Sequence, residues 1–299
     1  MSDLKKGGPL RSTGTTYAPF DRSLPAYGIN CIALPALGGQ NTVDDDFVKK
    51  VARTITLIFG SGGSIDSTLQ QSTLESMLSW KCAQCIGYGT MGDYSPPLND
   101  SNYSGWDNTR DTNANVDFIW QLSSGTYKDQ ITEVLEHALH TITVYGLQYS
   151  FPTKMNQTNQ TSDIYLAMQQ AITTNGSDGN PIFDTSGYSG SMSDPDYRAL
   201  LMREYYYLLV YAEWGFITNF VEGGSLAPEW NDSAINSAGV QSYNPLGHQL
   251  YLDTAAKTIT APSTSTLTTM YDGGSSGYTN DYEIVRSTNV DFSGPVTVK

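Results

Sequence analysis

Two of the three histidines in this chain lie in one short segment together with two glutamates. His137 and His140 are three residues apart, and Glu133 and Glu136 each precede one of them by four residues. On a helix, side chains at these offsets converge one turn apart on one face, as metal ligands must. The same groups could carry out acid–base chemistry. Alternatively, the segment is a solvated helix face on which each Glu–His pair contributes about 0.2–0.5 kcal/mol.

The apolar residues of this segment follow the helical period and fall on the side opposite the titratable groups. That apolar side should face the core. Val144 and Leu147 continue the titratable stripe beyond His140, so we expect the end of the stripe to be covered by other parts of the chain. We therefore predict a helix over residues 126–146, with these residues on its apolar side: Ile131, Val134, Leu135, Ala138, Ile142 and Tyr145.

The segment Glu136-His137-Ala-Leu-His140 resembles the zincin helix motif His-Glu-x-x-His with its first two residues exchanged. In zincin metallopeptidases the two histidines bind zinc and the glutamate is the general base. The resemblance implies that His140 is the second zinc ligand, that Glu136 replaces the first histidine, and that His137 occupies the position of the base. A carboxylate can serve as a zinc ligand, whereas an imidazole in the base position departs from the hydrolytic pattern. The resemblance therefore implies a zinc-dependent, peptidase-like hydrolase or an inactive relative.

A third ligand would have to come from another element, and Glu204 is the best candidate. It lies in a predicted helix over residues 196–219 that is apolar nearly all round, so this carboxylate should be buried. A buried carboxylate needs a partner. The partner could be a metal, as for the downstream glutamate ligand of some zincins, or it could be Arg198, Arg203 or a tyrosine hydroxyl. Glu213 lies on the other face of the helix and is a weaker candidate.

The sequence thus predicts a metal site formed by Glu136, His140 and Glu204, with His137 as an acid–base residue. His248 is isolated in the sequence, and we expect it to be structural. Acidic residues elsewhere could supply oxygen ligands for calcium, but they lack EF-hand spacing. These acidic residues are Asp44, Asp45, Asp46, Asp93, Asp100, Asp107 and Asp111.

The three cysteines cannot all pair within the chain, which excludes a disulfide scaffold. Cys82 and Cys85 have CxxC spacing, but the preceding residues 67–81 are predicted to be helical. A redox motif of this type should instead follow a strand and begin a helix. We therefore favour packing or a local disulfide for these cysteines over a redox pair or a zinc knuckle.

The chain has 299 residues, a formal net charge of −14 and a pI near 4.4. This charge excludes a nucleic-acid binder that works by neutralising phosphates. No segment offers 18 uncharged apolar residues, so we expect no membrane span. The N-terminal residues lack the apolar stretch of a cleaved signal peptide. Together with the neutral polar surface composition, this favours an extracellular or particle-associated protein.

Hydrophobic patterns and turn residues predict an α+β fold with long polar loops. Residues 1–28 read as a flexible arm, residues 29–222 as a mainly helical core, and residues 223–299 as an irregular, β-rich region packed on the same domain. We expect further helices over residues 44–59 and 163–174 and a strand over residues 29–37. Residues 115–120 could be a strand or a short helix, and residues 248–252 and 281–285 read as β-like fragments.

Two functions from different classes fit these patterns. The first is a metal-binding, peptidase-like hydrolase acting on a peptide or protein substrate. The second is a structural protein of a surface layer, filament or virus particle, which would assemble with copies of itself through the N-terminal arm over residues 1–28.

Overall fold

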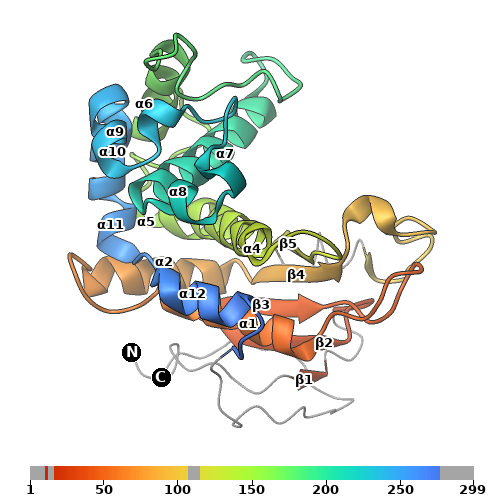
Figure 1. The fold of residues 1–299 in the computed structure, drawn as a ribbon. Coiled ribbons are helices and arrows are strands. Elements are labelled where there is room, and N and C mark those ends of the chain that lie inside the picture. Colours follow the sequence, from red (N-terminus) through yellow and green to blue (C-terminus); the bar gives the residue numbers. More distant parts are fainter. Residues whose placement is uncertain (1–10, 13–16, 107–114, 277–299) are drawn as a thin grey trace. The chain divides into compact units, whose positions relative to one another are not determined.

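The computed structural model describes residues 11–12, 17–106 and 115–276, and these residues form two compact units. The first unit contains residues 1–56, 77–138 and 267–299, and the second contains residues 57–76 and 139–266. The described part of the first unit combines a sheet with helices, whereas the described part of the second is mainly helical (Figure 1). The predicted α+β class is confirmed.

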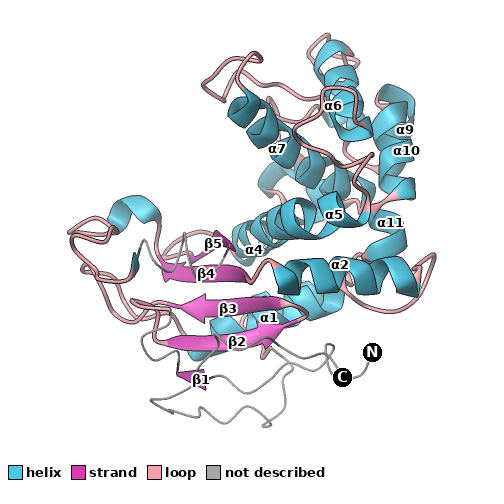
Figure 2. Cartoon of the chain, turned by 180° about the vertical axis from the view of Figure 1, so that it is seen from behind, coloured by secondary structure: helices cyan, strands magenta, loops and turns pink. Residues whose placement is uncertain are grey.

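A mixed sheet organises the first unit (Figure 2). Its strands follow one another in chain order, with the β1–β2 and β2–β3 pairs antiparallel and the β3–β4 and β4–β5 pairs parallel. Tyr27 and Gly28 have φ values of 48° and 82° and join β2 to β3, which is the two-residue hairpin turn that suits strand twist. The strands are β1 (Arg11–Ser12), β2 (Arg22–Ala26), β3 (Ile29–Ala33), β4 (Cys82–Tyr88) and β5 (Asn115–Gln121).

Part of the predicted N-terminal arm belongs to the core of this sheet. Phe20, Leu24 and Ala26 are buried, and β2 pairs with β3 along its whole length. The prediction of a flexible arm is therefore wrong for residues 17–28, because most of β2 is buried in the core. Residues 1–10 and 13–16 of that predicted arm lie outside the described residues.

The CxxC segment lies in a strand. Helix α2 (Ser67–Ser79) ends shortly before it, Lys81 adopts a positive φ of 52°, and Cys82 then begins β4. Cys31, Cys82 and Cys85 are buried and are not joined by disulfides. Burial raises the pKa of the Cys31 and Cys82 thiols well above the usual range, so they remain protonated and serve as packing residues. The prediction missed β4 because a parallel strand buried on both faces shows no apolar–polar alternation.

Aromatic side chains form a cluster on one face of the sheet. Phe118 and Trp120 alternate along β5, and their rings stack with centroids 5.5 Å apart. Trp106 stacks between Phe118 and Phe20 at 5.6 and 5.8 Å, respectively. These contacts resolve the two predictions for residues 115–120 in favour of a strand. They also anchor the strand that carries Asp117.

Helix α1 (Asp45–Ile58) also packs within the first unit. Asp45 and Asp46 occupy its first turn, where carboxylates suit the helix dipole, and Val48, Val51 and Ile55 are buried. The Thr54 hydroxyl lies 2.9 Å from the Tyr271 hydroxyl on helix α12 (Thr264–Tyr271). The range of α1 confirms the helix predicted over residues 44–59.

Helix α7 (Pro195–Glu213) is the central helix of the second unit. Asp194 accepts a hydrogen bond from the Asp196 backbone N–H, and Pro195 occupies the first helical position, so the start of the helix is well defined. Tyr205, Leu208 and Tyr211 are buried completely. Around α7 lie α6 (Asp163–Thr173), α8 (Phe216–Phe220), α9 (Ser237–Tyr243), α10 (Pro245–Asp253) and α11 (Ala255–Thr258) (Figure 1).

The prediction of a β-like fragment over residues 248–252 is wrong, because these residues lie in α10. Asn244 accepts a hydrogen bond from the Gly247 backbone N–H at 2.6 Å, and Pro245 follows it in the first turn. An Asn N-cap and a Pro at the first helical position begin a helix, and they outweigh the β-like composition of the residues that follow. The described residues after 223 are accordingly helical and irregular, and residues 281–285 lie outside the described part of the chain.

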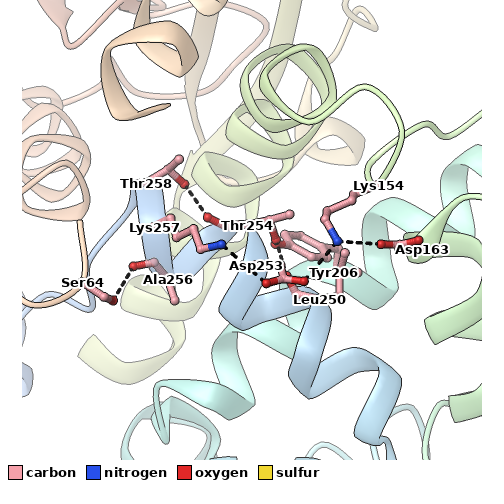
Figure 3. Close-up of polar contacts among 10 residues, drawn as sticks. All are labelled: Ser64, Lys154, Asp163, Tyr206, Leu250, Asp253, Thr254, Ala256, Lys257 and Thr258. Atoms are coloured by element: carbon pink, nitrogen blue, oxygen red, sulfur yellow. Dashed lines mark hydrogen bonds and ion pairs between the residues drawn. The ribbon is translucent and has the colours of Figure 1, made fainter. Parts of the chain in front are cut away.

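Polar contacts connect α10 and α11 with neighbouring segments (Figure 3). The Lys154 ammonium lies 3.0 Å from both the Asp163 and the Asp253 carboxylates. The Tyr206 and Thr254 hydroxyls are 2.6 Å apart in the interior.

Among the described residues, no helix combines the length and apolar character needed to cross a bilayer, as expected.

Candidate metal centre

Helix α4 (Tyr127–Thr141) carries the titratable stripe. The Asp129 carboxylate accepts hydrogen bonds from the Thr126 backbone N–H at 2.7 Å and from the Thr126 hydroxyl at 3.0 Å, which fixes the start of the helix. Immediately after Thr141 the chain widens into a π-helix over Ile142–Leu147. The Tyr145 carbonyl within it accepts a hydrogen bond from Ser76 at 2.6 Å. Such π segments occur frequently at functional sites.

The apolar side of α4 is buried as predicted. Four of its residues, and Ile142 just beyond the helix, are inaccessible to solvent: Ile131, Val134, Leu135, Ala138 and Ile142. Tyr145, which was expected on the same side, is only half-buried. The helix is continuous, and its residues up to Ala138 belong to the first unit while the remainder belongs to the second. His137 therefore belongs to the first unit and His140 to the second.

His137 lies between two carboxylates of the first unit. Its Nδ1 is 3.3 Å from Asp117 Oδ1, and its Nε2 is 3.4 Å from Glu133 Oε1. Glu133 Oε1 also accepts a hydrogen bond from the Trp120 backbone N–H at 2.9 Å. Burial disfavours the charged imidazole, but the hydrogen bond to Asp117 and the charges of Asp117, Glu136 and Glu133 outweigh it and raise the pKa of His137 to about 9. His137 therefore connects α4 to β5.

His140 meets Glu204 in the interior of the second unit. His140 Nε2 lies 3.3 Å from Glu204 Oε2, and the two residues are only 3% and 8% exposed. The Tyr207 ring contacts the His140 imidazole edge-on, with ring centroids 5.1 Å apart. Arg203 Nη2 donates to Glu204 Oε1 at 3.4 Å. Burial alone would raise the pKa of Glu204, but His140 and Arg203 hold it below its usual value.

Glu136 completes the predicted group of three. It precedes His140 by one turn of the same helix, and one ligand atom each from Glu136, His140 and Glu204 lie within 4.8 Å of one another. Asp117, His137 and His140 form a second group by the same criterion. In the second group both ring nitrogens of His137 already face carboxylates, so the first group is the better candidate for a metal.

Glu229 lies near this group and was missed by sequence reasoning. Its carboxylate accepts a hydrogen bond from the Tyr188 hydroxyl. Burial chiefly raises the pKa of Glu229; the negative charge of Glu204 adds to this effect, while the Tyr188 hydrogen bond and the charge of His140 oppose it. The segment Pro228-Glu229-Trp230 is irregular, so no helical or strand period marked it in the sequence. Asp117 was missed for a related reason, because it lies in β5 rather than on α4, and the helical period of α4 does not extend to a strand.

The other sequence-predicted candidates lie apart from His140 and Glu204. His248 Nδ1 is 2.8 Å from Glu213 Oε1, so these two residues form a pair of their own between α10 and α7. Burial raises the pKa of Glu213 although Ser237 and His248 oppose the shift. This arrangement agrees with the expected structural role of His248 and with the placement of Glu213 on the other face of α7.

The acidic residues considered for calcium make local contacts. Asp45 pairs with Arg22 at 2.6 Å, and Asp46 pairs with Lys50 at 3.0 Å. The Asp93 carboxylate accepts a hydrogen bond from the Thr90 backbone N–H at 2.7 Å. These contacts stabilise helix ends and turns. Asp107 and Asp111 lie outside the described residues.

Comparisons of the chain with protein-family models, with curated proteins and with solved structures find no match. The zincin resemblance therefore rests on the segment Glu136–His140 alone. The function has to be argued from the geometry of the site.

Proposed function

We propose that this chain binds one divalent transition-metal ion, with zinc as the first candidate, through Glu136, His140 and Glu204. The observation that carries the proposal is the buried contact between His140 Nε2 and Glu204 Oε2 at 3.3 Å. Ligand atoms about 2.1 Å from a tetrahedral zinc ion are about 3.4 Å apart. The pair is therefore already spaced as two neighbouring ligands would be.

The chemistry of the donors supports the same proposal. One imidazole and two carboxylates are ligand types that zinc accepts. Two carboxylates close to one imidazole in a buried place gather negative charge, which a divalent cation would balance. Arg203 supplies part of that balance in the structure. Three protein ligands would also leave one coordination position for water, as in catalytic rather than structural zinc sites.

The proposal does not include peptide hydrolysis. His137 holds the position of the zincin base, but its two ring nitrogens face Asp117 and Glu133. An imidazole held in this way connects a helix to a strand. Metal binding is therefore the function that the geometry supports best.

Metal analysis tests the proposal directly. Protein purified without chelator should contain about one zinc ion per chain. His140→Ala and Glu204→Gln should each abolish the bound metal, because each removes a ligand from a set of three. His248→Ala is the matched control, since His248 pairs with Glu213 and should leave the metal content unchanged. Circular dichroism would establish that each variant is folded.

Two results would overturn the proposal. One is wild-type protein that takes up no metal when dialysed against zinc. The other is folded His140→Ala protein that retains the wild-type metal content.

A further inference from the structure

Glu229 and Tyr188 form a half-buried polar pair that lies outside the three-ligand group. Both residues belong to the second unit, together with His140 and Glu204. The hydroxyl of Tyr188 donates to Glu229 Oε1 and so fixes the orientation of this carboxylate. Partial burial of a carboxylate costs desolvation free energy, and the Tyr188 hydrogen bond offsets part of that cost.

The backbone holds Glu229 firmly. The Glu229 carbonyl accepts a hydrogen bond from the Asp184 N–H at 3.0 Å, and the Asn231 N–H donates to the Ile182 carbonyl at 2.9 Å. Phe183 and Trp230 form an isolated β-bridge between these two contacts. The position of Glu229 is therefore fixed by paired backbone on both sides of it.

Packing places this segment alongside the part of α7 that carries Glu204. The rings of Phe183 and Trp230 lie 5.8 and 6.0 Å, respectively, from the ring of Tyr205. Tyr205 directly follows Glu204 in the helix and is completely buried. Glu229 directly precedes Trp230, so this aromatic cluster brings the two carboxylates into one neighbourhood. The charges of Glu204 and His140 both act on Glu229.

The carboxylate of Glu229 is not one of the converging ligand atoms, since the group within 4.8 Å contains Glu136, His140 and Glu204. A carboxylate that is near a ligand set but outside it interacts with a bound metal through an intervening molecule. Carboxylates that accept hydrogen bonds from metal-bound groups orient them and strengthen metal binding.

We propose that Glu229, oriented by Tyr188, is an outer-sphere positioning residue of the metal centre and accepts a hydrogen bond from a water molecule in its fourth coordination position. This inference rests on the proposed metal binding by Glu136, His140 and Glu204. It assigns a role to two residues outside the ligand set.

Cobalt(II) is a suitable probe because its visible spectrum reports both occupancy and coordination. Wild-type protein titrated with Co²⁺ should show saturable binding with a visible absorption band. Glu229→Gln keeps the shape of the side chain but removes its charge, and it should weaken Co²⁺ binding about 10- to 100-fold, the range typical of outer-sphere partners. It should also shift the visible band, and Glu229→Asp should restore part of the affinity. Tyr188→Phe should change affinity in the same direction by a smaller factor.

Glu222→Gln is the matched control, because Glu222 is an exposed glutamate in the same unit. It should bind Co²⁺ like the wild type. The melting temperatures of the metal-free variants establish that each protein is folded, and the visible band is a readout that a purely structural role of Glu229 would leave unchanged.

The outcomes separate the two proposals. If the wild type shows no saturable Co²⁺ binding, or if Glu204→Gln binds as the wild type does, the metal centre itself is wrong and the inference on Glu229 fails with it. If Glu204→Gln abolishes binding while Glu229→Gln keeps the wild-type affinity and spectrum, the metal centre stands and the role of Glu229 is overturned.

Discussion

At the scale of single residues, the two histidines of α4 have different surroundings although they are only three positions apart. His137 has 21% of its side chain exposed and faces Asp117 and Glu133, whereas His140 has 4% exposed and faces Glu204. A histidine between two carboxylates is held as a cation, and it serves to connect elements. The buried His140, which converges with Glu136 and Glu204, keeps the arrangement that a metal ion can use.

The role of His137 as a connector leads to a prediction about stability. Asp117→Asn removes the negative charge that faces His137 Nδ1 while keeping the size of the side chain. A partly buried, charge-assisted hydrogen bond contributes about 1.5–3 kcal/mol, so we expect the free energy of unfolding to fall by about that amount. Urea unfolding measures it. Asp272→Asn, at an exposed position of the same unit, should change stability by less than about 0.5 kcal/mol. Equal effects of the two substitutions would contradict this role.

At the scale of elements, helix ends determine several features that the sequence patterns alone left open. Asn244 is the clearest case, because it is completely buried and its side chain forms three hydrogen bonds. Its side-chain oxygen accepts from the Gly247 N–H at 2.6 Å and from the Tyr205 hydroxyl at 3.1 Å, and its amide nitrogen donates to the Ala167 carbonyl at 3.0 Å. One residue thus begins α10 and joins it to α6 and α7.

A pair of N-cap substitutions separates the cap from these interhelical contacts. Asn236→Ala removes an exposed cap that accepts only from the Gly239 N–H at 3.0 Å, and it should cost about 1 kcal/mol. Asn244→Ala also leaves the buried Tyr205 hydroxyl and Ala167 carbonyl without this partner, so we expect a loss of about 3 kcal/mol or more. Thermal and urea unfolding of both variants test the difference. Similar losses would mean that Asn244 acts as a simple cap.

The elements also show what could be predicted from the sequence and what could not. Helical spacing predicted the contacts along α4 and the buried position of Glu204 in α7, because both depend on a local period. Asp117 and Glu229 could not be found in this way, since they lie in a strand and in an irregular segment, to which the helical period does not apply. Strand β4 was missed because it is buried on both faces and shows no alternation.

At the scale of the whole molecule, the N-terminal region bears on the alternative function. A structural protein that assembles through residues 1–28 would use this region as a detachable arm. Strand β2, however, pairs with β3 from Arg22 to Ala26, and Phe20 and Leu24 are buried within the first unit. Residues 17–28 are therefore required by the fold itself.

Two truncations distinguish folding from assembly. Removal of residues 1–28 deletes β2 and exposes the edge of β3, so we expect loss of the cooperative unfolding transition or aggregation. Leu24→Ala is a milder test of the same packing and should lower the free energy of unfolding by about 2–5 kcal/mol.

Removal of residues 1–10 should leave the melting temperature within about 2 °C of the full chain, since it removes none of the sheet contacts described for β2. Sedimentation velocity of this shorter truncation then tests assembly on a folded protein: full-length chains that form particles, beside truncated chains that do not, would support the structural function. A folded, cooperative protein without residues 1–28 would instead show that the sheet does not need β2.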